Sequence, residues 1–146
     1  MNSEDWAYIA GFVDADGHIG GTRSGYRSNG AIRYAVRMTV TNANPEIANW
    51  LKKEFGGSVH LSNTSAPTHH RPVWRWSAMG RDAKPVLLNL LPYLRVKKKQ
   101  AELVLQFIET LRQPSDSPRR LTNEQDAQRN YIVQQLRRLN YRGRLL

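Results

Sequence analysis

Residues 9–17 read IAGFVDADG, a run of small and apolar residues that ends in two aspartates and a glycine. From residue 5 to residue 16 the apolar residues recur at helical spacing and form two stripes instead of one. A helix of this kind buries one face in its own core and the other against a partner, which Gly11 and Ala15 would allow to approach closely. A second copy of the same helix is a candidate partner. The stripes are Trp6, Ile9, Ala10 and Val13, and Tyr8, Gly11, Phe12 and Ala15.

A hairpin is predicted after this helix. Glycines at positions 17, 20, 21 and 25 rule out a continued helix, and residues 33–41 then alternate strictly between two kinds of side chain. Because successive strand residues point to opposite faces, the even-numbered apolar residues are expected to face a core. The odd-numbered residues, among them Arg33, Arg37 and Thr39, are expected to face outward and to form a basic, hydrogen-bonding surface.

A second helix and a second hairpin are predicted next. Asn44 as N-cap, Pro45 at the first helical position and Gly56 after the end bracket the helix. Strand alternation then returns from residue 59, and after a polar turn it resumes at residues 71–77. The two tryptophans of that last strand are expected inward, with Arg75 between them outward.

The remaining sequence is predicted to be helical. Helix signals cover residues 82–91 and 96–111, with a proline break between them. Residues 113–120 are rich in Pro, Ser and charge and are expected to be a linker. A capping box of Thr122 and Gln125 begins a last helix that is expected to run to residue 139. The predicted order is helix, hairpin, helix, hairpin and then helices.

Composition favours a nucleic-acid partner. The chain has 146 residues, enough for one domain, and its 22 Lys and Arg against 12 Asp and Glu give a formal charge of +10. There is no cysteine, which excludes a disulfide framework and a cysteine zinc site. The sequence shows neither a signal peptide nor a membrane span, so we expect a soluble intracellular protein whose compartment stays undetermined.

The motif at residues 9–17 resembles the signature of the LAGLIDADG homing endonucleases. It matches the small pair at Ala10 and Gly11 and the final Asp, Ala, Asp and Gly. Two further parts look like the corresponding parts of single-motif members: VTN at residues 40–42 with the helix around Trp50 that follows it, and LLPYLRVKKKQAELVL at residues 90–105. The resemblance covers residues 1 to about 110.

The resemblance implies an α+β fold of the order αββαββα, with a four-stranded antiparallel sheet that forms half of a saddle over DNA. Helices would pack on one face of the sheet, and C-terminal helices would follow. We expect a single domain over residues 1–146, with a core at about residues 5–112 and a C-terminal linker and helix at 113–146. A single motif implies a homodimer and a nearly palindromic target of roughly 20 base pairs. The interface residues would be Tyr8, Gly11, Phe12 and Ala15.

The resemblance also implies the chemistry. The metal-binding acid of the family falls on Asp16, the Ala15 carbonyl is a second ligand, and Mg²⁺ is the expected ion, with Mn²⁺ able to substitute. Lys97 matches a basic residue near the scissile phosphate, and Asn42 lies where many members carry a Gln that positions water. Glu46 departs from a position that is often basic. The alternatives remain that the two aspartates only end a helix, and that the lysine belongs to a solvated helix start.

Sequence recognition is expected from the outward face of the strands, because a two-stranded ribbon fits the major groove of DNA. For each residue the alternative is an exposed side chain that contacts nothing or only a phosphate. The expected DNA contacts are Thr22, Ser24, Tyr26, Asn29, Arg33, Arg37, Thr39, His60, Ser62, Arg71 and Arg75.

We therefore predict a sequence-specific endonuclease for double-stranded DNA, of the kind that moves introns or inteins. The expected partners are DNA and a second copy of the chain, with intron RNA as a further candidate and no membrane. The alternative is a relative that does not cut DNA, either an RNA maturase or a DNA-binding regulator. A generic basic RNA-binding protein would explain the charge but not the motif helix.

Overall fold

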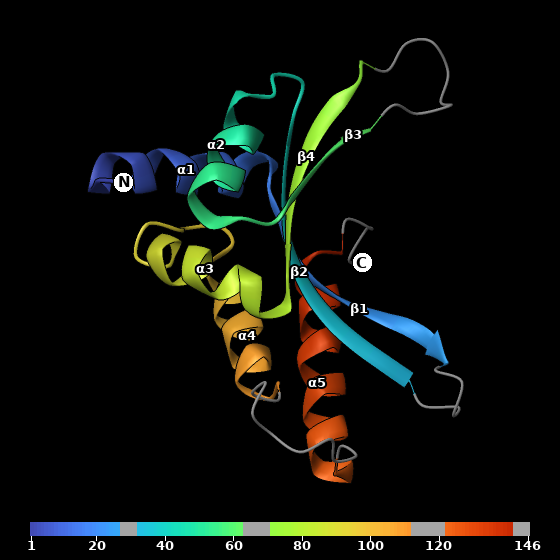
Figure 1. The fold of residues 1–146 in the computed structure, drawn as a ribbon. Helices are drawn as coiled ribbons and strands as arrows, with labels where there is room; N and C mark the ends of the chain where they lie inside the picture. Colours follow the sequence, from blue (N-terminus) through green and yellow to red (C-terminus); the bar gives the residue numbers. More distant parts are fainter. Residues whose placement is uncertain (27–31, 63–70, 112–121, 142–146) are drawn as a thin grey trace.

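A computed structural model describes residues 1–26, 32–62, 71–111 and 122–141. The predicted order of helix, hairpin, helix, hairpin and helices is confirmed (Figure 1). The predicted turn residues 64–68 and the linker at 113–120 lie outside the described residues. The elements are α1 (Ser3–Asp16), β1 (His18–Tyr26), β2 (Ile32–Asn42), α2 (Glu46–Phe55), β3 (Ser58–Ser62), β4 (Val73–Met79), the 3-10 helix η1 (Gly80–Ala83), α3 (Lys84–Leu90), α4 (Lys98–Glu109) and α5 (Asn123–Leu139).

The four strands form one antiparallel sheet in the order β1-β2-β4-β3. Each hairpin therefore contributes its inner strand to the centre, where Thr39 of β2 pairs with His18 of β1 and with Ser77 of β4. Figure 1 shows the helices on one side of the sheet and the two hairpins diverging toward its opposite ends. The predicted α+β fold with a four-stranded antiparallel sheet is confirmed.

The core lies between the sheet and the helices, as the strand alternation predicts. Val36, Met38 and Val40 of β2 are buried, and so is Trp76 of β4. The indole Nε1 of Trp76 donates a 2.8 Å hydrogen bond to the carbonyl of Gly56, which satisfies the one polar atom of that side chain. From the helix side, α1 buries Ile9, Ala10 and Val13 of its first predicted stripe, whereas Trp6 of that stripe is partly buried.

The first helix begins at Ser3, two residues before the predicted start. The Asn2 side chain accepts a 2.9 Å bond from the backbone N–H of Asp5, and the Asp5 carboxylate accepts a 3.0 Å bond from the N–H of Asn2, so the two form a capping box. The added turn carries no apolar residue, and apolar periodicity therefore misses it. Trp6 then packs its ring against Phe55 of α2, with centroids 5.1 Å apart.

Other boundaries shift by a few residues. Helix α2 starts one residue later than predicted, because Pro45 takes the N-cap position, yet Asn44 still accepts a 2.9 Å bond from the first helical N–H, that of Glu46. Strand β4 begins at Val73 and not at residue 71. The two predicted helices beyond the sheet are shorter, and residues 95–97 before α4 adopt a non-helical loop.

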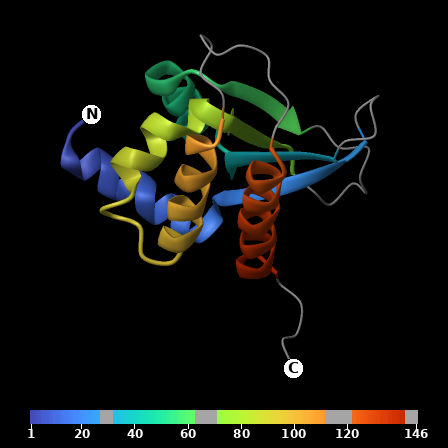
Figure 2. The same ribbon diagram turned by 90° about the horizontal axis from the view of Figure 1, so that it is seen from below.

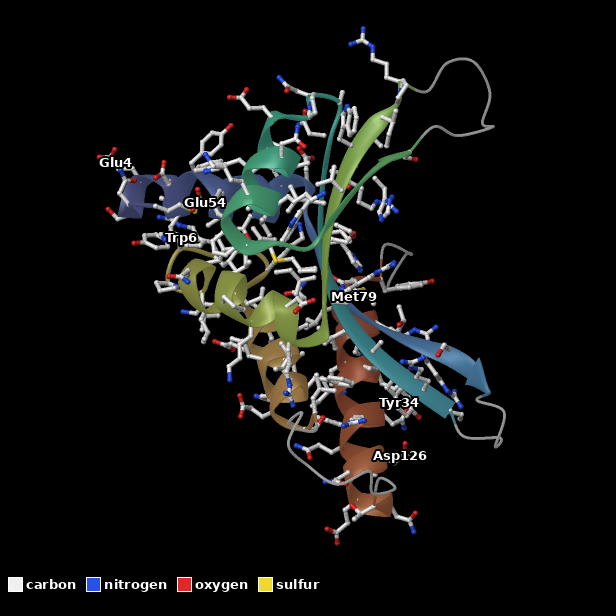
Figure 3. All side chains as sticks on the ribbon, in the orientation of Figure 1. Glu4, Trp6, Tyr34, Glu54, Met79 and Asp126 are labelled. Atoms are coloured by element: carbon white, nitrogen blue, oxygen red, sulfur yellow. The ribbon has the colours of Figure 1, made fainter. Side chains whose placement is uncertain are left out.

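The last helix begins with the predicted capping box of Thr122 and Gln125 and ends at Leu139 as expected. It lies beside α4 (Figure 2) and against β1, where a side chain at Gly21 would meet Val133 and Leu136. Figure 3 places Tyr34 between β2 and α5. Among the described residues, no helix is long and apolar enough to cross a membrane.

Candidate active site and nucleic-acid interface

Asp16 is the last residue of α1 and its side chain is exposed. The helix ends through a 2.9 Å hydrogen bond from the N–H of Gly17 to the carbonyl of Val13. A Cβ at position 17 would lie 2.8 Å from the Val13 Cα, so only glycine allows the chain to turn this tightly. Strand β1 starts at the next residue, His18, and Asp16 therefore stands where the helix meets the sheet.

Lys97 reaches the same end of α1. Its Nζ donates to the carbonyl of Val13 at 2.9 Å and to the carbonyl of Asp14 at 2.7 Å. These carbonyls belong to the last helical turn, which carries the negative end of the helix dipole and favours a cation. Lys97 thus lies at the same end of the motif helix as Asp16, and its partly buried ammonium is held by α1.

Asp14 holds the loop that carries Lys97. Its carboxylate accepts hydrogen bonds from the backbone N–H groups of Arg95 at 2.9 Å, Val96 at 3.2 Å and Lys97 at 2.9 Å. Sequence reasoning missed this role and treated the residue as a helix end. No local pattern indicates the contact, because the two segments lie far apart along the chain.

Asn42 was expected to position water, but its side chain also takes part in a turn. Its Oδ1 accepts a 2.8 Å bond from the N–H of Asn44, so the acceptor closes the turn between β2 and α2. In the sheet Asn42 pairs with Trp74, in register with the core-facing residues of β2. A water molecule would therefore meet its amide Nδ2. Glu46 is exposed at the first position of α2.

Asp16 and the carbonyl of Ala15 offer oxygen ligands at this end of α1, and both residues are exposed. Oxygen donors of this kind suit Mg²⁺, which keeps several waters and binds one or two carboxylates together with substrate phosphates. In the described ranges, no group of three or more His, Cys, Asp or Glu side chains lies together. The donor chemistry of Asp16 and the Ala15 carbonyl fits the expected ion.

The expected DNA contacts in the described strands share the sheet face opposite the helices. The register pairs Ser24 with Arg33 across one hairpin, and His60 with Arg75 across the other. The hydroxyl of Ser24 also donates a 3.2 Å bond to the Arg33 carbonyl. Of the eleven expected residues, Asn29 and the side chain of Tyr26 are not described. Five others are exposed, namely Ser24, Arg33, His60, Arg71 and Arg75, while Thr22, Arg37 and Ser62 are partly buried.

Two residues at the centre of this face differ from the expectation of free side chains. Thr39 is only 7% exposed, because His18 and Ser77 flank it on both neighbouring strands, and this argues against direct contact with DNA. Arg37 is partly buried, and its Nε is a buried donor without a hydrogen-bond partner among the described residues. An unpaired buried donor is costly, so a ligand that offers an acceptor would stabilise this arginine.

Three residues of the second predicted stripe of α1 are exposed, and the fourth, Phe12, also packs against the core. Tyr8 is 62% exposed, Gly11 and Ala15 are exposed, and Phe12 is partly buried with its ring centroid 6.5 Å from that of Tyr8. A Cβ at Gly11 would meet no atom of its own chain within 4 Å. Sequence reasoning did not single out Val96, an apolar side chain that is 71% exposed in the loop held by Asp14. Within one chain, Tyr8, Gly11 and Ala15 of the expected interface stripe are thus exposed, whereas Phe12 is partly covered.

Comparisons with known proteins agree with this geometry, although no protein-family model matches the chain. The DNA endonuclease I-CvuI of Chlorella vulgaris is 32% identical over 116 residues, which are 76% of this chain and 68% of the relative. A crystal structure of I-CvuI with its DNA target and Ca²⁺ superposes with a TM-score of 0.76 at 26% identity, over 98% of this chain and 85% of that chain.

An archaeal intron-encoded homing endonuclease, I-Vdi141I in complex with DNA, shares the fold at 16% identity. Its TM-score is 0.76, over 97% of this chain and 87% of that chain. From the identity with I-CvuI, the shared fold and the motif at the end of α1, the chain belongs to the LAGLIDADG homing endonucleases, metal-dependent enzymes that cut DNA at specific sequences, as a single-motif member.

Proposed function

We propose that two copies of this chain pair through α1 and cut both strands of a nearly palindromic DNA site. A site with one helical turn for each half would span roughly 20 base pairs. The observation that carries the proposal is the convergence of Asp16 and Lys97 at one end of a helix whose outer stripe is exposed. The relative I-CvuI was solved with its DNA target in the presence of Ca²⁺, which supports DNA as the substrate here.

The pairing follows from the outer stripe of α1. An exposed Tyr8 beside a glycine and an alanine one turn apart gives an apolar surface with room for a partner backbone. Helices that meet at small residues pack closely, and a two-fold axis makes the same patch serve both chains. Two copies of Asp16 would then face each other at the helix ends, where each alone offers a single carboxylate.

The proposed roles of the site residues follow from their positions. Asp16 and the Ala15 carbonyl would hold Mg²⁺, for which Mn²⁺ would substitute. When bound, the ion would activate water and stabilise charge on the phosphate. Lys97 holds its ammonium at the helix end, where it stabilises negative charge that develops on the scissile phosphate. Asn42 orients the attacking water through its amide Nδ2, since its oxygen is used in the turn.

The outer face of the sheet reads the DNA. Arg33 and Arg75 are exposed on the two hairpins, which diverge so that they can follow the major groove in either direction (Figure 1). Arg37 lies between them, and a hydrogen bond from its unpaired Nε to an acceptor on the DNA would be favourable. The three arginines and His60 supply the base and phosphate contacts, and a net charge of +10 strengthens the attraction to DNA.

We also propose that residues 1–146 form one domain. The expected core of about residues 5–112 is too narrow, because Ile132, Val133 and Leu136 of α5 are buried in the same apolar cluster. The prediction of an intron-RNA partner, and that of intron or intein mobility for this particular chain, have no support from contacts in the structure and remain predictions.

The test is cleavage of a randomised DNA library by the purified chain with Mg²⁺, with Ca²⁺, and with Asp16→Asn as a matched control. We expect one family of nearly palindromic sites to be cut with Mg²⁺, and no cutting by the Asp16→Asn chain. Tight and specific binding without cleavage in Mg²⁺ or Mn²⁺ would contradict the proposal and would favour a DNA-binding regulator.

A further inference from the structure

The end of α1 and the loop before α4 hold each other through five hydrogen bonds. Three run from the backbone N–H groups of Arg95, Val96 and Lys97 to the Asp14 carboxylate. Two run back from the Lys97 ammonium to the carbonyls of Val13 and Asp14. Asp14 thus contacts Lys97 in both directions, with its carboxylate on the backbone and its carbonyl on the side chain.

This arrangement fixes where the ammonium lies. A lysine side chain has four rotatable bonds and high rotamer entropy, so its charged group is poorly placed unless both ends are held. Here the carboxylate fixes the backbone of Lys97, and two carbonyls of α1 fix the Nζ at 2.7 and 2.9 Å. Both anchors belong to the turn that ends at Asp16, and the charge is therefore placed relative to the metal-binding acid.

From this geometry we infer that Asp14 is a positioning residue for catalysis, which acts through Lys97 and does not touch DNA or metal. The inference rests on the proposed function of Lys97 at the scissile phosphate. It separates the two aspartates of the motif: the exposed Asp16 offers a ligand, while the partly buried Asp14 uses its oxygens on backbone N–H groups. Misplacement of a catalytic group by about 1 Å can cost roughly 100-fold in rate.

The test is a double-mutant cycle of Asp14→Ala and Lys97→Met under single-turnover conditions, with DNA binding measured separately in Ca²⁺. We expect Asp14→Ala to slow cleavage by about 10- to 100-fold when Lys97 is present. DNA affinity should change less than about 3-fold, and in the Lys97→Met background the same change should add less than about 3-fold, because the effect passes through the lysine. Equal losses in both backgrounds, or no loss in either, would overturn the inference.

Two variants separate positioning from a general loss of helix structure. Asp14→Asn keeps one acceptor oxygen and should fall between the wild type and Asp14→Ala; it also completes the cycle if the alanine chain does not fold. Asp5→Asn is the matched control, because Asp5 accepts a backbone N–H at the other end of the same helix. We expect it to lower stability without changing the cleavage rate of the folded protein.

Amide hydrogen exchange gives a readout that needs no cleavage. Loss of the Asp14 carboxylate should speed exchange at the N–H groups of Arg95, Val96 and Lys97, and Asp5→Asn should not. If the wild-type chain cuts no DNA, the proposed function fails by itself, and unchanged exchange in Asp14→Ala would still overturn the positioning role separately.

Discussion

Gly11 offers a sharp test of the proposed dimer. A side chain at this position should stabilise the isolated chain but destabilise the association of two chains. Within one chain a Cβ at Gly11 meets nothing within 4 Å, so Gly11→Leu should not disturb the fold. A helix-forming residue in place of glycine should even stabilise α1 by about 0.8–1 kcal/mol.

In the proposed dimer the same leucine would enter a close helix contact. Extra side-chain volume in a packed interface costs about 1–3 kcal/mol, and two-fold symmetry applies the cost twice. The expected loss is about 2–6 kcal/mol of association free energy, or roughly 30-fold to 10⁴-fold in the dimer dissociation constant.

Sedimentation equilibrium and circular dichroism measure both effects. We expect Gly11→Leu to show the same helix content as the wild type, to sediment as a monomer at concentrations where the wild type is a dimer, and to lose DNA cleavage. Its melting temperature should become independent of protein concentration. Ala127→Leu, at an exposed small residue of α5, is the control and should dimerise normally. A Gly11→Leu chain with the wild-type dissociation constant would refute the pairing through α1.

Three further predictions concern contacts that α3, α4 and α5 make away from the site. Arg129 is 8% exposed and donates to Thr110 Oγ1 at 2.9 Å and to the Thr110 carbonyl at 2.6 Å. Arg129→Ala should therefore lower the free energy of unfolding, measured in urea, by about 2–4 kcal/mol, and a change below about 0.5 kcal/mol would contradict this. Gly21→Val should cost about 1–3 kcal/mol, because its Cβ would lie 3.0 Å from Val133 Cγ2, and Val133→Ala should recover part of the loss if α5 docks there. The Lys84 ammonium, 2.9 Å from Glu109 Oε1, lowers the pKa of Glu109. The ion pair therefore stabilises the fold above the ordinary glutamate pKa, and this stabilisation is lost as pH falls through the lowered pKa. An NMR titration of Lys84→Met should show a higher pKa for Glu109, and an unchanged pKa would exclude the pair in solution.

Local periodicity was enough to predict most of the fold. The even-numbered residues of β2 face the core because a strand has a period of two, and the two stripes of α1 separate because a helix has a period of 3.6. The capping box at Thr122 fixed the start of α5. The predicted start of α1 was wrong because the first turn of the helix is polar. Asn2 caps this turn together with Asp5, and the prediction from apolar periodicity did not include that pair.

The site was predictable only in part. The motif and its resemblance indicated Asp16 and Lys97, but nothing near Asp14 in the sequence indicates that it binds the N–H groups of residues 95–97. The burial of Thr39 likewise depends on neighbours from two other strands, which a pattern within one strand does not include. Contacts between distant segments decide these features, and they follow from the tertiary fold.

The most direct test of the account is anomalous X-ray diffraction from Mn²⁺ in crystals of the chain bound to its DNA site. We expect two chains that meet along α1, and anomalous peaks beside the carboxylates of both copies of Asp16, with the Lys97 ammonium at the same helix ends. Metal bound away from Asp16, or an arrangement that keeps the two copies of Asp16 apart, would contradict it.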